Sequence, residues 1–261
     1  MLDSIQIDTH THTVLSGHAW STLRENASAA ARRGMAGFCS TEHGHTMPGA
    51  GPFFLTAAQN MLPRMVEGIR VFYGVEANMV DLGGGMDIDV KQLFDSEFTI
   101  ASMHDLCMAP GTVAENTGAY IAVLNHPCVD ILGHIDDRKT PSEFSVVIGE
   151  AARLGKLIEI NNNSMLIRKG SLERVEEVAT LCAELDCRVS VASDAHFDDM
   201  VGSVAPALEM LARIGFPEHL VVNRNLESFE AYLAEKNARL DAARGNYAET
   251  GVSTRRRARR L

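Results

Sequence analysis

The sequence predicts an α/β fold in which seven strand–helix units close, or nearly close, into a barrel. Short apolar runs alternate with amphipathic stretches along most of the chain, and the connections between them are short. This alternation predicts parallel strands joined by right-handed crossovers. The length of 261 residues is one that α/β barrels use for a single domain. A doubly wound open sheet is the alternative.

The order of the elements follows from the hydrophobic pattern. The apolar runs predict strands over residues 4–8, 36–41, 70–76, 98–103, 130–134, 157–161 and 189–193. The amphipathic stretches predict helices near 22–33, 55–67, 113–124, 142–154, 171–186, 203–214 and 226–236. The first helix follows the capping-box pair Thr22 and Glu25. Three glycines within 80–95 predict a turn or small hairpin there.

These elements are expected to form one domain over 1–240, followed by a C-terminal tail over 241–261 that is basic at its end. The formal net charge of -10 argues against an extended nucleic-acid partner. The chain has no apolar run of 18 residues and no leader-like start, so neither a membrane partner nor secretion is expected. Five cysteines without a CxxC pair predict free thiols and a cytoplasmic protein.

The segment from Asp8 to His12 is the most informative motif. It follows an apolar start, and it places His10 and His12 two residues apart. Alternate residues of a strand point to the same side, so both imidazoles can aim at one point. Two neutral imidazoles at one point are ligands that a transition metal prefers.

Other strand ends carry similar side chains. In parallel α/β barrels the reactive groups come from the C-terminal ends of the strands. Reading those ends in order predicts one cluster, made of His10, His12, His18, His43, Glu76, His104, His134, Asp194 and His196. A single histidine at a strand end is more often an ordinary satisfied polar residue. A whole set of titratable groups on one rim is costly to bury without a metal, so the sequence predicts a metal centre.

Several motifs resemble the PHP (polymerase and histidinol phosphatase) superfamily of metal-dependent phosphoesterases, and more narrowly its small stand-alone YcdX-type phosphatases. The matching segments lie in the order of that family over residues 8–196: DTHTHT from 8, HAWS from 18, TEHG from 41, GVEAN from 74, His104, ILGH from 131, EINN from 159 and SDAH from 193. The resemblance implies a distorted TIM-like (βα)7 barrel. It also implies three divalent metal ions, drawn from zinc, manganese and iron, at the C-terminal rim of the strands.

The resemblance also implies roles for the ligands. His10, His12, Glu76 and Asp194 would hold the first metal. Glu76 would bridge to a second metal held by His104 and His134, and His18, His43 and His196 would hold the third. Glu76, Asp194 and His196 would be the catalytic residues. The chain departs from the family where Glu42 replaces an aspartate and where Ile135 and Asp136 replace Pro-Gly, and neither change removes a ligand.

Several further residues near these motifs are candidates for supporting roles. His126 precedes the strand at 130–134 rather than ending it, so His134 is the preferred ligand. His45 is expected to face the substrate or to support a ligand, and His219 to be structural or exposed. Arg168 is a candidate for binding the substrate phosphate. Trp20, beside His18, either walls the pocket or packs in the barrel.

Together these features predict a metal-dependent phosphatase that hydrolyses a small phosphomonoester with a metal-activated hydroxide. One alternative is a phosphodiesterase or exonuclease on nucleotides or short oligonucleotides. The other is a metal-binding module without activity. The expected partner is a small phosphorylated substrate, and the formation of a homo-oligomer stays open.

Overall fold

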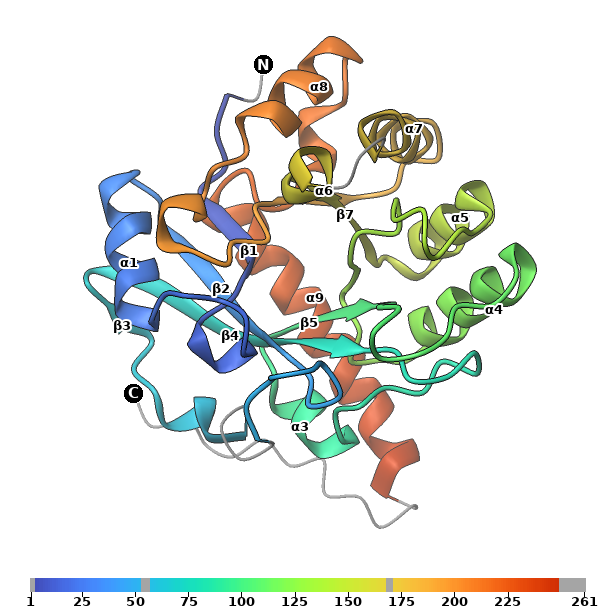
Figure 1. Cartoon of the computed structure of the whole chain (residues 1–261), viewed down its shortest axis with the longest axis horizontal. Helices are drawn as coiled ribbons and strands as arrows, with labels where there is room; N and C mark the ends of the chain where they lie inside the picture. Colours follow the sequence, from blue (N-terminus) through green and yellow to red (C-terminus); the bar gives the residue numbers. More distant parts are fainter. Residues whose placement is uncertain (1–2, 53–56, 168–170, 249–261) are drawn as a thin grey trace.

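The chain folds around one sheet of eight strands, which the helices surround (Figure 1). A computed structural model describes residues 3–52, 57–167 and 171–248. The strands are β1 (Ile7–Thr11), β2 (Gly37–His43), β3 (Met65–Val66), β4 (Ile69–Asn78), β5 (Phe98–Ser102), β6 (Ile131–Leu132), β7 (Leu157–Asn161) and β8 (Val189–Ala192). Their order is β1-β2-β4-β5-β6-β7-β8, all parallel, and β3 pairs antiparallel with β4.

The seam between β1 and β8 nearly closes this sheet into a barrel. Thr11 forms a parallel bridge with Ala195, beyond the end of β8. Deeper in the seam, the Asn223 side chain replaces ladder hydrogen bonds: its Nδ2 donates to the carbonyls of Ile7 (2.7 Å) and Val191 (2.6 Å). Its Oδ1 accepts from the Val191 N–H at 3.0 Å. The distorted TIM-like barrel is thus confirmed, and the doubly wound open sheet is wrong.

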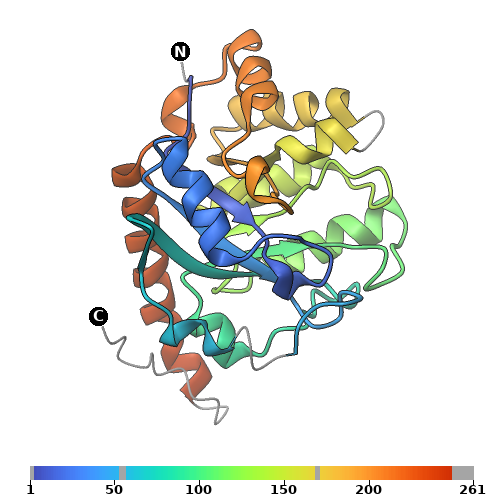
Figure 2. The same ribbon diagram turned by 60° about the vertical axis from the view of Figure 1, so that its left-hand side comes forward.

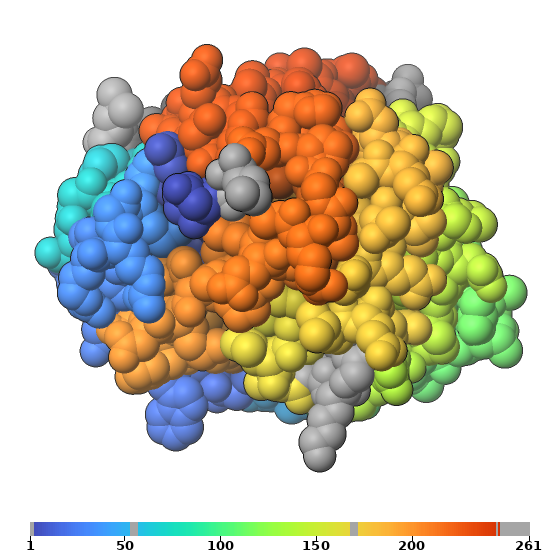
Figure 3. Space-filling model, turned by 90° about the horizontal axis from the view of Figure 1, so that it is seen from above, coloured from blue at the N-terminus to red at the C-terminus, as the bar shows by residue number. Residues whose placement is uncertain are grey.

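The helices cover the outside of the barrel (Figure 1). They are α1 (Leu23–Arg32), α3 (Val90–Asp95), α4 (Val113–Leu124), α5 (Phe144–Leu154), α6 (Asn162–Ile167), α7 (Ser171–Glu184), α8 (Ala205–Arg213) and α9 (Leu226–Ala248), with 3-10 turns η1 (Val14–Ser16), η2 (Ala58–Met61), η3 (Asp198–Met200) and η4 (Glu218–Leu220). The predicted capping box of Thr22 and Glu25 opens α1. Figure 3 shows α7 and α8 side by side on one face.

Helix α9 covers the N-terminal ends of the strands, and Figure 2 shows it running along one side of the molecule. The Phe229 ring packs against Phe72 and Phe98, at centroid distances of 5.0 and 5.5 Å. The ammonium group of Lys236 lies 2.5 Å from a carboxylate oxygen of Asp130, just before β6, and both side chains are fully buried. One end of the barrel is therefore closed, which leaves the opposite end for a site.

The helix predicted over 55–67 is wrong within the described residues. Only the short turn η2 forms there, and Met65–Val66 form β3 instead. Pro63 explains the difference, because proline has no N–H to donate and disfavours helical geometry at the residue before it. Helices α3 and α6, both short, were not predicted.

The remaining predicted elements form, with shifted ends. The glycine-rich segment does contain a tight hairpin, in which Met79 bridges Met86. Helix α9 continues to Ala248 rather than ending at 236. The division into a domain over 1–240 and a tail from 241 stays a prediction, with residues 241–248 helical and the basic end outside the described residues.

Two further expectations concern the whole chain. Across the described ranges, none of the helices has the length and apolar character needed to span a bilayer. All five cysteines are free thiols, as predicted, and Cys39, Cys128, Cys182 and Cys187 are buried. The cytoplasmic location and the oligomeric state stay predictions.

Candidate metal centre

The structure brings together all nine side chains predicted as metal ligands, at the C-terminal ends of the strands. His10 lies in β1, His43 ends β2 and Glu76 lies in β4. The others follow strand ends or lie in the adjoining loops: His12, His18, His104, His134, Asp194 and His196. Three subsets of this cluster have ligand atoms within 4.8 Å of one another: His10, His12 and Glu76; His43, Glu76 and His104; and His12, His43 and His196.

The Glu76 carboxylate lies at the centre of the cluster and is fully buried. Its Oε1 lies 3.1 Å from His134 Nε2 and 3.4 Å from His104 Nε2. Its Oε2 lies 3.2 Å from His10 Nε2 and 3.4 Å from His12 Nε2. The two oxygens thus face two different groups of imidazoles, which is the geometry of a carboxylate that bridges two cations.

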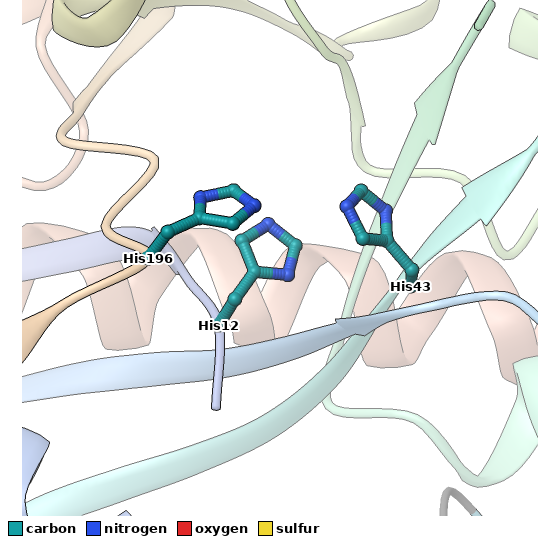
Figure 4. A group of neighbouring side chains, drawn as sticks. All are labelled: His12, His43 and His196. Carbon is teal, nitrogen blue, oxygen red and sulfur yellow. The ribbon is translucent and has the colours of Figure 1, made fainter. Parts of the chain in front are cut away.

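A third group of imidazoles lies on the outer side of the cluster (Figure 4). His12, His43 and His196 turn their rings toward one another there, and the Nε2 atoms of His196 and His18 are 2.9 Å apart. Asp194 lies between this group and the inner one, with Oδ1 3.4 Å from His12 Nε2. His43 belongs to two of the three subsets. It could therefore bind the second predicted metal as well as the third, to which the resemblance assigned it.

Hydrogen bonds to Nδ1 of several histidine rings orient these rings, so that Nε2 points into the cluster. Ser16 Oγ donates to Glu42 at 2.7 Å, so the contact of 2.9 Å between Ser16 Oγ and His12 Nδ1 has the imidazole as donor. His10 Nδ1 lies 2.6 Å from Glu159, and His104 Nδ1 lies 2.8 Å from Asn78 Oδ1.

Carbonyl oxygens fix two more rings in the same way. Nδ1 of His18 donates to the carbonyl of Ser16 at 3.1 Å, and Nδ1 of His196 donates to that of Asp194 at 3.0 Å. A neutral imidazole that donates from Nδ1 presents its lone pair at Nε2. Such outer hydrogen bonds are what hold metal-binding histidines in place.

Within the cluster of nine predicted ligands, two buried polar atoms have no hydrogen bond. His43 Nδ1 and Glu76 Oε2 lie 2.7 Å apart but are not aligned as donor and acceptor. Buried polar atoms are rarely left without a partner in proteins. A cation between a ring nitrogen and a carboxylate oxygen would satisfy both atoms, so the donor set fits a metal.

The electrostatics agree with this fit. Burial raises the pKa of Glu76, but the charges of His43, His10 and His104 outweigh burial and hold that pKa well below its usual value. Burial lowers the pKa of His12, and the nearby His43 and His196 lower it further, so this ring stays neutral. Burial raises the pKa of Asp194, but the nearby His10 charge holds that pKa well below its usual value. Carboxylates kept ionised beside a neutral imidazole are ready-made metal ligands.

Comparison with known proteins decides the family. Residues 8–205 match the PHP domain. The chain belongs to the PHP domain family. A probable phosphatase of Clostridium botulinum is 40% identical over 230 residues, covering 88% of this chain and 95% of the relative. A probable phosphatase of Acetivibrio thermocellus is 38% identical over 234 residues, covering 90% and 97%.

A solved PHP structure supports the fold. The histidinol phosphate phosphatase of Lactococcus lactis, crystallised with zinc, L-histidinol and phosphate, matches with a TM-score of 0.58 and 18% identity. The match covers 81% of this chain and 94% of that protein. The resemblance drawn from the sequence motifs is therefore confirmed, and this PHP chain is a phosphoric ester hydrolase.

Two of the proposed ligands occupy a backbone region that residues other than glycine rarely adopt. The φ angles are 30° at His134 and 53° at Asp194. Such a conformation costs about 1–3 kcal/mol and persists only where its surroundings impose it. At His134 the backbone N–H donates to Glu159 Oε2 at 2.8 Å, which helps to hold the turn. The PHP barrel thus stores strain at its candidate site.

Glu159 supports the cluster, a role that its place in the EINN motif did not predict. One oxygen accepts from the His10 ring and the other from the His134 backbone, while Asn161 Nδ2 donates to it at 3.1 Å. The carboxylate therefore connects ligands from β1 and from the loop after β6. Its position inside an apolar strand predicts a buried carboxyl group, which needs hydrogen-bond partners, and this was the available signal.

Above the predicted metal ligands the barrel opens into a cavity of about 920 Å³. Arg138 and Lys139, from the loop after β6, line it and were also missed. Asp105, next to His104 in the sequence, accepts from Lys139 Nζ at 2.7 Å. Asn78, not Asp105, accepts from the His104 ring.

Of the three predicted substrate contacts, Trp20 and His45 do not line the cavity, and the third is not placed. Trp20 neither lines the cavity nor packs in the barrel, because its side chain is 80% exposed. Its backbone N–H donates to the His196 carbonyl at 2.8 Å, which turns the indole outward. His45 is exposed and is not among the residues that line the cavity. Arg168 lies outside the described residues.

The preference for His134 over His126 agrees with the geometry. His126 lies near the N-terminal ends of the strands, where Lys156 Nζ donates to its carbonyl at 3.1 Å just before β7. Its Nδ1 accepts from the Cys128 N–H at 3.3 Å. His219 is exposed, in η4.

This environment predicts an acid-sensitive contribution to stability. Burial, and then the Lys156 charge, lower the pKa of His126 to about 4. Between about pH 6.5 and pH 4, His126 is therefore protonated in the unfolded chain and neutral in the folded chain. The free energy of unfolding decreases as the pH falls through this range. The free energy of unfolding of the wild type decreases between pH 7 and pH 4.5. In the His126→Gln variant this decrease should be smaller by about 2–3 kcal/mol.

Urea unfolding at both pH values, for wild type, His126→Gln and the exposed control His219→Gln, measures this difference. The control should follow the wild type. Parallel losses in all three proteins would mean that His126 is not held neutral in the fold.

Proposed function

We propose that the chain is a metal-dependent phosphatase that hydrolyses a small phosphomonoester at a centre of three divalent ions. One observation carries the proposal. Seven imidazoles and two carboxylates converge on one pocket, and five of the rings have Nδ1 hydrogen-bonded away from it. The names of the curated PHP relatives support phosphatase chemistry.

The three subsets define which residues would hold each ion. His10, His12, Glu76 and Asp194 would hold the first. Glu76 would be shared with the second, beside His104 and His134. His196 and His18 would hold the third, and His43 lies between the second and third groups. Imidazole nitrogens mixed with carboxylate oxygens suit zinc, iron and manganese.

Bound ions of this kind polarise phosphoryl oxygens and lower the pKa of water to about 7. The side chains around the centre would supply charge balance, exclusion of water and attraction of the phosphate. Glu76 and Asp194 stay ionised, and so offset the charge of the centre while fixing its geometry. The buried ring of His12 and the bridging carboxylate exclude bulk water from the inner side. Arg138 and Lys139 line the cavity, where their positive charge would attract a phosphate, and Lys139 also pairs with Asp105.

A chelation experiment tests the proposal. Purified protein should release phosphate from an aryl phosphomonoester, lose that activity on exhaustive metal removal, and regain it with zinc, manganese or iron(II). A bis-aryl phosphodiester serves as the matched substrate and should be hydrolysed much more slowly. Circular dichroism should show the same fold before and after chelation. Full turnover by the metal-depleted protein would contradict the proposal, and faster hydrolysis of the diester would favour a phosphodiesterase.

A further inference from the structure

The cavity above the proposed metal centre has an apolar wall. Beyond the proposed metal ligands, five lining residues from the segments after β2, β5, β7 and β8 are aliphatic or thioether: Met47, Pro48, Leu106, Ile167 and Met200. Asp105 and Asn163 also line the cavity from these segments. These residues come from four separate segments of the chain. The apolar wall is therefore built by several segments of the barrel rim rather than by one loop.

Two residues of this wall are unusually exposed for their type. Leu106 is 67% exposed and Ile167 is 66% exposed, although both line the cavity. Exposed apolar side chains are ordinary when scattered singly, but a group of them at a concave site marks a surface that a ligand covers. Met47 and Met200 beside them are flexible and can adapt to ligand shape.

The opposite wall is charged, and two of its side chains, Asp105 and Lys139, form an ion pair. Asp105 accepts from Lys139 Nζ at 2.7 Å, and Asp137 accepts from the Lys139 backbone N–H at 3.0 Å. Among the described residues that line the cavity, none carries a hydroxyl group and only Asn163 carries an amide. The remaining partners for the hydroxyl groups of a sugar or polyol are the charged side chains of this wall, where Asp105 and Lys139 already bind each other. The apolar wall offers a hydroxyl group no hydrogen bond, and a buried hydroxyl left without one is costly.

We propose that the substrate is a phosphomonoester whose alcohol is a predominantly apolar chain or ring, seated against Leu106 and Ile167. This inference rests on the proposed function and adds the class of its leaving group. In the reaction water forms a new bond to phosphorus, the bond from phosphorus to the alcohol oxygen breaks, and that oxygen takes a proton. The products are inorganic phosphate and the free alcohol, whose apolar part leaves the wall last.

A series of linear alkyl phosphates tests the inference on the metal-loaded enzyme. Ethyl, propyl and hexyl phosphate have leaving groups of similar reactivity, so differences in kcat/KM report contact with the wall. We expect kcat/KM to rise about fourfold for each methylene group that the wall covers. Propyl phosphate should exceed glycerol phosphate, which has the same carbon chain with two hydroxyl groups, by about tenfold or more.

Two neighbouring residues on α6 provide a matched pair of variants. Ile167→Ser should lower the hexyl-to-ethyl ratio of kcat/KM by about tenfold. Leu166 is 61% exposed but does not line the cavity, so Leu166→Ser should keep the wild-type ratio. Both side chains are exposed, so neither change is expected to disturb folding.

The outcomes separate this inference from the proposed function. Phosphate release that is independent of chain length, a preference for glycerol phosphate, or equal effects of the two serine variants would overturn the apolar wall and leave the phosphatase standing. No release from any monoester by the metal-loaded enzyme would overturn both.

Discussion

Changing Glu76→Gln is expected to lower kcat/KM for an aryl phosphomonoester by about a thousandfold or more. Glu76 is the side chain that faces both inner groups of imidazoles, with oxygens 3.1 Å from His134 Nε2 and 3.2 Å from His10 Nε2. The amide keeps the shape but loses the negative charge and one acceptor. Ion-mediated stabilisation of a phosphoryl transition state is worth several kcal/mol, which corresponds to this factor in rate. Steady-state kinetics and the metal content of the purified variant measure the effect.

Glu97→Gln is the matched control for this change. Glu97 is also buried, but it lies at the N-terminal end of β5, where Glu97 Oε2 accepts from the Tyr73 N–H at 2.8 Å. Its replacement can affect stability, and the folded enzyme should keep its activity within about twofold. If Glu76→Gln retained more than a tenth of the wild-type activity, Glu76 would not be the shared ligand.

The second large effect concerns stability at the closed end of the barrel. Lys236→Met should lower the free energy of unfolding by about 3–5 kcal/mol, because it leaves the buried Asp130 charge without its nearest partner. Lys236 also donates to the carbonyls of Ser96 (3.3 Å) and Glu97 (3.1 Å), which ties α9 to the start of β5. Arg239, 3.0 Å from Asp130, offsets only part of the loss. Urea unfolding of the metal-loaded protein measures the change.

Lys91→Met is the corresponding control on the surface. Lys91 pairs with Asp95 at 2.7 Å within α3, and its side chain is 42% exposed. Exposed pairs four residues apart contribute about 0.3–0.5 kcal/mol, so this variant should unfold almost as the wild type does. Equal effects of the two lysine changes would show that burial does not set the strength of the Lys236–Asp130 pair.

The strands and the gathering of ligands were predictable because both follow from local rules. The ends of parallel strands share one rim, so a histidine after each apolar run reaches the same pocket as the others. The helix predicted over 55–67 was wrong because Pro63 interrupts an otherwise helical apolar periodicity. The two-residue strand β3 forms through pairing with β4, which no local pattern encodes.

The supporting residues of the site were less accessible to sequence reasoning. Asn78 orients His104, and Glu159 orients His10, over separations of 26 and 149 residues. Such pairs are set by the direction of side chains in the folded barrel. The positive φ angles at His134 and Asp194 are likewise imposed by tertiary contacts. Trp20 looked like a pocket residue because it is close to His18 in sequence, and the backbone turns it outward.

Counting the metal ions in the folded protein tests the central claim most directly. Elemental analysis of metal-loaded protein, with anomalous diffraction at the zinc, iron and manganese edges, would give both number and position. We expect three ions per chain, with Glu76 between two of them and His196 beside the third. A fully folded protein that takes up no ion at His10, His12 and Glu76 would contradict the account.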